Sequence, residues 1–366
     1  MKKLFLLILL CPFFFTHCYA EDLGSHIGSA AQADLVETSL PDDVRDISGT
    51  LRLDAPYDTE GALKRLYHSF IKQCKERFSS SMRSAAELFM IALLCAITES
   101  FCNTDVIRDA VDRIGCCIAS LFVFGNFSSV VDEAAATVRT LTDYAHVALP
   151  VLFTTAAAGG GIVSASTRFA SACLSMDVML TVAQSCIVPL IYMYFAVSVS
   201  QSLYDNSLLQ AASRITKWCI TTALTVLAMA FGAYLSLTGL IAGSGDVLAV
   251  KSARTVLSRV LPIVGGLLSD SAAVLLSAAA FVKNSVGVFA LIAVCALCIG
   301  PVAAFSVKLF VFKTVAATVD FLPGARLPKL ISAMSSVYAM LLGLIGCCAS
   351  IFFIAIVSGI KVVSPL

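Results

Sequence analysis

Charged residues are scarce in this chain of 366 residues. Asp, Glu, Lys and Arg make up 13% of it, against about 25% in typical soluble domains. Twenty-five basic residues nearly balance twenty-four acidic ones, which leaves a formal net charge of +1. Such a balance excludes a protein that binds nucleic acid through a surplus of positive charge. Intrinsic disorder is excluded as well, because it requires low hydrophobicity and 58% of these residues are hydrophobic.

Motifs for catalysis or metal binding are also missing. Only four histidines occur, and no two of them have the spacing of a metal-binding pair. The chain contains no GxSxG, HExxH or P-loop string. Residues 243–246 (GSGD) and 204–205 (YD) match short motifs of intramembrane aspartyl proteases, but one predicted span separates the two aspartates and places them on opposite membrane faces. We therefore predict no enzyme, no catalytic residue, no cofactor and no metal site.

Long apolar runs dominate instead, and the mean hydropathy is +0.90. The first twenty residues have the layout of a cleaved signal peptide, with Lys2 and Lys3, an apolar run over 4–15 and a small-x-small site ending at Ala20. That run is shorter than the ~20 residues that cross a bilayer, so an uncleaved first span is the weaker alternative. We predict an exported chain beginning at Glu21.

The only polar region covers residues 21–81, and its character changes along its length. Its first part is acidic and interrupted by Gly and Pro. In its second part Leu63, Leu66, Phe70 and Phe78 recur at helical spacing between basic residues. This pattern predicts a basic amphipathic helix that lies on anionic headgroups, with docking on a partner helix as the alternative.

Residues 82–366 are expected to form an all-α, polytopic membrane domain of seven to eight spans. Each secure apolar run has about the length that the hydrocarbon core requires. The expected spans are 82–98, 114–131, 144–163, 178–199, 218–242, 285–307 and 335–360, and the uncertain one is 262–282. The stretch 246–261 is expected to lie in the membrane interface.

The distribution of Lys and Arg predicts the orientation of these spans. If the N-terminal segment is exported and all eight segments cross, ten basic residues fall in inside loops and five outside. The inside residues are Arg108, Arg113, Arg168, Lys251, Arg254, Arg259, Lys308, Lys313, Arg326 and Lys329. The outside ones are Arg139, Arg214, Lys217, Lys283 and Lys361.

Polar and helix-breaking residues inside apolar runs supply the candidate functional positions, because a charge in hydrocarbon is costly. Asp270 is the first candidate, as part of a polar path or as the partner of a cation; as the alternative, it caps a half-helix that begins near Ser269. Glu87 falls in the first span. Pro262 and the pair Gly265-Gly266 make residues 262–282 either a span or a re-entrant hairpin. Lys283 follows at its end, where it can reach the interface.

The sequence resembles the stage III sporulation protein AE family of endospore-forming bacteria. The resemblance is carried by residues 261–270 (LPIVGGLLSD), 283–288 (KNSVGV) and 246–253 (DVLAVKSA). It implies a membrane subunit of the channel or secretion complex that joins mother cell and forespore. It places that subunit in the mother-cell membrane around the forespore. Its implied partners are other membrane proteins of the stage III sporulation A operon, among them an ATPase and ring-forming subunits.

A different class of function is also open, namely an autonomous ion-coupled secondary transporter. Such transporters commonly contain an internal repeat with paired broken helices. The two halves of this chain show no convincing repeat, which favours the non-enzymatic assembly subunit with a permease-like or export-gate role.

Overall fold

The computed structural model describes residues 40–41, 44–45, 59–158, 162–204, 206–230, 233, 265–324 and 326–360. Helices account for almost all of these residues, and strands are absent from them, which confirms an all-α membrane domain. The helices are α4 (Thr59–Ser100), α5 (Asp105–Ala158), α6 (Ile162–Val182), the π-helix η2 (Ala183–Ile187), α7 (Val188–Leu203), a helix over 207–230, α9 (Gly265–Val319) and α10 (Arg326–Ile360). The predicted signal peptide at 1–20 lies outside the described residues.

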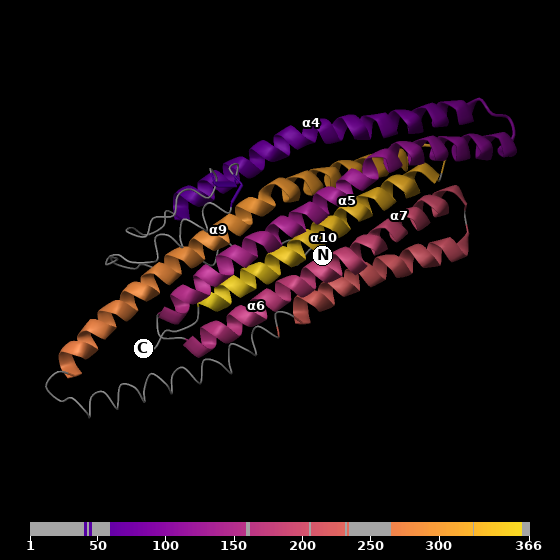
Figure 1. The fold of residues 1–366 in the computed structure, drawn as a ribbon. Helices are drawn as coiled ribbons and strands as arrows, with labels where there is room; N and C mark the ends of the chain where they lie inside the picture. Colours follow the sequence, from indigo (N-terminus) through magenta and orange to yellow (C-terminus); the bar gives the residue numbers. More distant parts are fainter. Residues whose placement is uncertain are drawn as a thin grey trace.

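The helices form an elongated bundle of roughly parallel and antiparallel rods (Figure 1). Short turns join α4 to α5, α7 to the helix over 207–230, and α9 to α10, so consecutive rods run antiparallel. Fully buried Phe127, Phe289, Phe305 and Phe352 are among the largest side chains of the core. Because bulky apolar side chains fill the centre, the bundle is a packed body along its described length.

Residues 105–158 form one helix, whereas the sequence predicted two spans, 114–131 and 144–163, separated by a loop. The correction has a physical reason. The intervening stretch is polar but consists of residues that tolerate a helix, with no Gly or Pro to end it. At about 1.5 Å per residue, these 54 residues extend about 81 Å, more than twice the ~30 Å of a hydrocarbon core.

Helix α9 corrects a second prediction. It runs without interruption from Gly265 to Val319, through the predicted end of one segment at 282 and the start of the next at 285. A re-entrant hairpin over 262–282 needs a turn, so that alternative is wrong for residues 265–282. The capping alternative for Asp270 is wrong too, because α9 begins before Ser269.

Among the described residues, five helices are long and apolar enough to cross a membrane. The count of seven to eight spans is therefore not confirmed. These helices are Glu60–Ser100, Asp105–Thr154, Ala172–Leu203, Val286–Val319 and Arg326–Val357. Of the predicted span 218–242, the described part is helical at 218–230 and 233.

Helix α4 joins the predicted exported segment to the first span. It passes through residues 81 and 82 without a break, so the predicted domain boundary falls inside a helix. The predicted amphipathic helix is present as its first half. Leu63, Ile71 and Phe78 on it remain exposed, which leaves apolar surface available to a bilayer or a partner.

Pro189 lies where the rod of α6 and α7 departs from α-helical geometry. The π-helix η2 ends two residues before it, and Pro189 occupies the first turn of α7. A proline lacks the N–H that an α-helix needs at that position, and the wider π-turn accommodates the lost hydrogen bond.

Gly115 of α5 permits close contact with α4, and replacing it tests this helix pair. A Cβ at position 115 would overlap Cys95 Sγ, although Cys95 Cβ lies at an ordinary 3.4 Å. We expect Gly115→Ala to lower the free energy of unfolding by about 1–3 kcal/mol. Adding Cys95→Ala removes the overlapping sulfur and should restore most of the loss, measured by circular dichroism on detergent-solubilised protein.

Gly125 provides the matched control on the same helix. A Cβ there meets nothing within 4 Å, so Gly125→Ala should leave stability unchanged or raise it by up to about 1 kcal/mol through helix propensity. Equal losses at both glycines would contradict the close approach of α4 and α5.

Candidate functional site: polar clusters of the helix bundle

Most of the predicted site residues lie on the first part of α9. Gly265, Gly266, Asp270 and Lys283 all have helical backbone there, and the surroundings of these side chains lie outside the described structure. Pro262 is itself outside the described residues. The functional role assigned to these five positions therefore stays a prediction.

Glu87 lies on an exposed face of α4. Its carboxylate is 3.8 Å from the guanidinium of Arg83, one turn earlier, and 48% of its side chain is exposed. Exposed pairs of this kind contribute little to stability. Glu87 therefore stands apart from the two polar clusters in which several helices meet.

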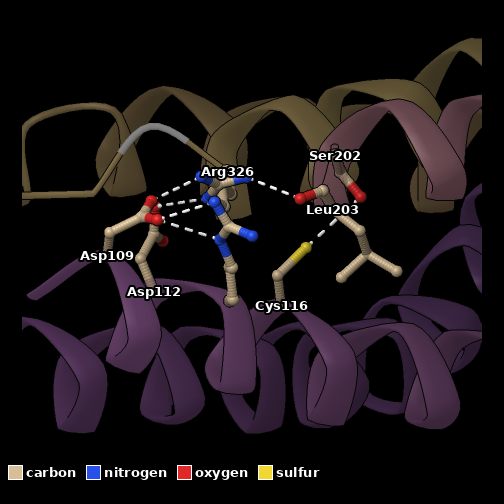
Figure 2. Close-up of polar contacts among 7 residues, drawn as sticks. Asp109, Asp112, Cys116, Ser202, Leu203 and Arg326 are labelled. Carbon is tan, nitrogen blue, oxygen red and sulfur yellow. Dashed lines mark hydrogen bonds and ion pairs between the residues drawn. The ribbon is translucent and has the colours of Figure 1, made fainter. Parts of the chain in front are cut away.

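The first of these clusters surrounds Arg326, the first residue of α10 (Figure 2). Its Nη2 lies 2.5 Å from Asp109 Oδ1 and its Nε lies 3.4 Å from Asp112 Oδ2, both on α5. Its Nη1 donates to the carbonyl oxygen of Leu203 at 2.6 Å. Only 13% of the Arg326 side chain is exposed. One side chain thus joins the start of α10 to two other helices.

Helix electrostatics explain why Arg326 needs these partners. A cation at a helix N-terminus is unfavourable, because the aligned peptide dipoles leave partial positive charge there. The two α5 carboxylates compensate for that charge. Leu203 ends α7, and the carbonyls of a last turn lack partners within their own helix. Arg326 therefore supplies the donor that α7 cannot supply for itself.

Gly324 completes the cluster from the turn between α9 and α10. Its φ of +107° lies in the left-handed region that favours glycine. A Cβ there would lie 3.1 Å from Asp112 Oδ1 and 3.3 Å from Glu99 Oε1. Glu99 is 2% exposed, and its Oε1 accepts no hydrogen bond within the described part of the chain. The turn therefore packs directly on two buried carboxyl groups.

The second cluster lies midway along the bundle around Glu133 of α5. Glu133 Oε1 is 3.8 Å from the guanidinium of Arg77 on α4, and Glu133 Oε2 is 3.7 Å from Lys308 Nζ on α9. The Lys308 ammonium also lies 5.7 Å from the ring centroid of Phe305 and 6.0 Å from that of Tyr338. One carboxylate thus contacts cations from two other helices, in a stretch that the sequence predicted as a loop.

The Arg326 cluster also corrects the predicted orientation of one hairpin. Its contacts bring the starts of α5 and α10 and the end of α7 to the same end of the bundle. Arg214 and Lys217, near the start of the following helix, therefore lie at the end that carries Arg108. Their assignment to the opposite side was wrong, because it counted α5 as two crossings.

Sequence reasoning missed both clusters. Asp109 and Asp112 are three residues apart and hence on one helix face, and that signal was available. The cation that pairs with them is Arg326, which lies 217 residues from Asp109 in the sequence. Nothing in either segment specifies this pairing. Glu133 and Lys308 were each placed near span ends, where a charge needs no partner.

The chemistry available to these clusters is electrostatic. Acidic and basic side chains meet in them, and the described residues contain no group of three or more His, Cys, Asp or Glu able to hold a metal ion. The twelve cysteines from Cys74 to Cys348 are free thiols. The arrangement suits holding helices in register.

Comparison with known proteins adds independent information. A family model described as stage III sporulation protein AE matches residues 48–362, which include all the helices described above. The protein named stage III sporulation protein AE in Bacillus subtilis (strain 168) is 19% identical over 273 residues. That match covers 74% of this chain and 68% of the relative. No solved structure matches.

Proposed function

This chain belongs to the stage III sporulation protein AE family, and we propose that it is the non-enzymatic polytopic subunit of a mother cell–forespore channel or secretion complex. In this proposal it acts as a permease-like or export-gate component. A partner ATPase supplies the energy, and ring-forming subunits and other membrane proteins of the stage III sporulation A operon complete the assembly. The mother-cell membrane around the forespore is its proposed location.

The observation that best supports a subunit over an autonomous transporter is the way its buried charges are used. Arg326 and Lys308 pair with carboxylates on other helices and tie α5 to its neighbours. An ion-coupled transporter needs polar groups that face a water-accessible path and exchange partners during the cycle. Charges already engaged between helices favour a body that needs other subunits to form a conduit.

Export of the N-terminal segment would make α4 run inward and place the end that carries the Arg326 cluster on the mother-cell cytoplasmic side. Seven basic residues at that end suit an inside position: Arg108, Arg113, Arg214, Lys217, Lys313, Arg326 and Lys329. Because the first half of α4 and Arg168 are also basic and lie toward the opposite end, this proposed orientation depends on the export of the N-terminal segment. The proposed ATPase would therefore meet the bundle at this end.

Reconstitution tests the proposed function. We expect the purified protein alone to give no more solute flux in liposomes than protein-free vesicles, with or without an ion gradient. We also expect affinity purification from sporulating cells to recover an ATPase with it. Gradient-driven solute uptake by the protein alone would contradict the subunit role and favour the autonomous transporter.

A further inference from the structure

A cleft of about 720 Å³ opens between α7, the helix over 207–230, α9 and α10. Four basic side chains line it: Arg214 and Lys217 from the helix over 207–230, Lys313 from α9, and Lys329 from α10. Asp320 is the only acidic residue among its lining residues. Four positive charges and one negative charge leave a formal charge of +3 on the walls.

The rest of the lining is suited to hydrogen bonding. Five serines and two glutamines line the cleft, and Leu, Ile, Val and Phe are absent from its lining residues. Lys217 Nζ donates to Ser336 Oγ at 2.9 Å, which holds its ammonium group at the wall formed by α10. Hydroxyl donors beside cations are the groups that bind phosphate oxygens.

The protein itself neutralises this charge only in part. Neither Arg214 nor Lys313 forms an ion pair with another described residue. Basic side chains gathered in one cleft repel one another, and an anion bound between them relieves that repulsion. The charge therefore points to a ligand with one or more negative groups.

The position of the cleft relative to the apolar surface indicates where that ligand comes from. Trp218 follows Lys217 directly and is 64% exposed, and Ile215 is 60% exposed on the same helix. An apolar stretch begins at Trp218 and continues along the helix toward residue 230, away from the turn that joins this helix to α7. Tryptophan beside a basic residue at the start of an apolar helical stretch is typical of the membrane–water interface. The cleft thus lies at the depth of lipid headgroups.

We propose that this cleft binds the phosphate of an anionic phospholipid headgroup. Basic pockets between membrane helices on the cytoplasmic side bind such headgroups, and the volume falls within the range of about 300–1,000 Å³ of ligand sites. Arg214, Lys217, Lys313 and Lys329 contact the phosphate oxygens, and the serines donate further hydrogen bonds. The acyl chains lie along the apolar surface next to Trp218.

Trp218 is the only tryptophan of the chain, so its fluorescence reports on lipid bound beside the cleft. The full-length protein is reconstituted in mixtures of phosphatidylcholine and phosphatidylglycerol, one of which carries brominated, quenching chains. We expect the wild type to bind phosphatidylglycerol next to Trp218 more than about tenfold more tightly than phosphatidylcholine. Arg214→Gln and Lys313→Gln should each reduce this preference about fivefold, since each removes one cation near the surface.

Arg139→Gln is the matched control, because it removes one positive charge from an exposed position of α5 and should leave the preference unchanged. An equal reduction by Arg139→Gln, or no preference in the wild type, overturns the proposal. Inorganic phosphate titrated into protein in phosphatidylcholine vesicles distinguishes a soluble source. If phosphate binds in the wild type and not in Arg214→Gln/Lys313→Gln, while lipid preference is absent, the occupant is a soluble anion and the lipid assignment is wrong.

Discussion

Replacing Arg326 with methionine is expected to lower the free energy of unfolding by about 3 kcal/mol. Removing one partner of a buried ion pair typically costs about 3–5 kcal/mol, and the lower end applies because Asp109 is half-exposed. The substitution removes the guanidinium from Asp112, whose side chain is 10% exposed. It also leaves the Leu203 carbonyl without its donor. Denaturant unfolding in detergent, followed by circular dichroism, measures the loss.

Two further variants separate lost charge balance from lost packing. Arg326→Met combined with Asp112→Asn should be more stable than the sum of the single changes predicts, because the carboxylate that has lost its cation is removed as well. Arg113→Ala is the exposed control: Arg113 lies 2.8 Å from Asp109 on the same helix, and 51% of its side chain is exposed. Its loss should cost less than about 1 kcal/mol. If Arg326→Met had the same free energy of unfolding as the wild type, the cluster would not hold the bundle together.

Glu133→Gln is expected to have the second largest effect, a loss of about 2–3 kcal/mol in the free energy of unfolding. The substitution preserves shape and removes the charge, so Lys308, whose side chain is 21% exposed, loses its carboxylate. Arg77 loses the same partner but is half-exposed and can turn to solvent. The Lys308 contacts with Phe305 and Tyr338 remain and limit the loss.

Glu87→Gln serves as the matched control for Glu133→Gln. Glu87 and Glu133 each lie 3.8 Å from an arginine, and they differ in that Glu133 also meets Lys308 and joins three helices. Glu87→Gln should change the unfolding free energy by less than about 0.5 kcal/mol. Equal effects at both glutamates would show that the central cluster adds nothing beyond an ordinary surface pair.

Local properties of the chain determined the fold class. Apolar runs of span length predict helices because a backbone in hydrocarbon must satisfy its own hydrogen bonds, and the described residues bear this out with α4, α5, α9 and α10. The strings at 246–253, 261–270 and 283–288 pointed to the family that the comparison over residues 48–362 then showed.

Tertiary structure alone decided which charges meet. Hydropathy predicts a loop for the polar stretch 132–143, yet its backbone stays helical, as its lack of Gly and Pro allows. Only the packing of the bundle brings Glu133 in this stretch to cations on α4 and α9. The partners of Arg326 depend on which helix ends lie side by side, a property of packing between segments about two hundred residues apart. Hydropathy and spacing act over a few turns, whereas pairing of charges depends on the whole bundle, and so the clusters and the cationic cleft emerged only from the assembled helices.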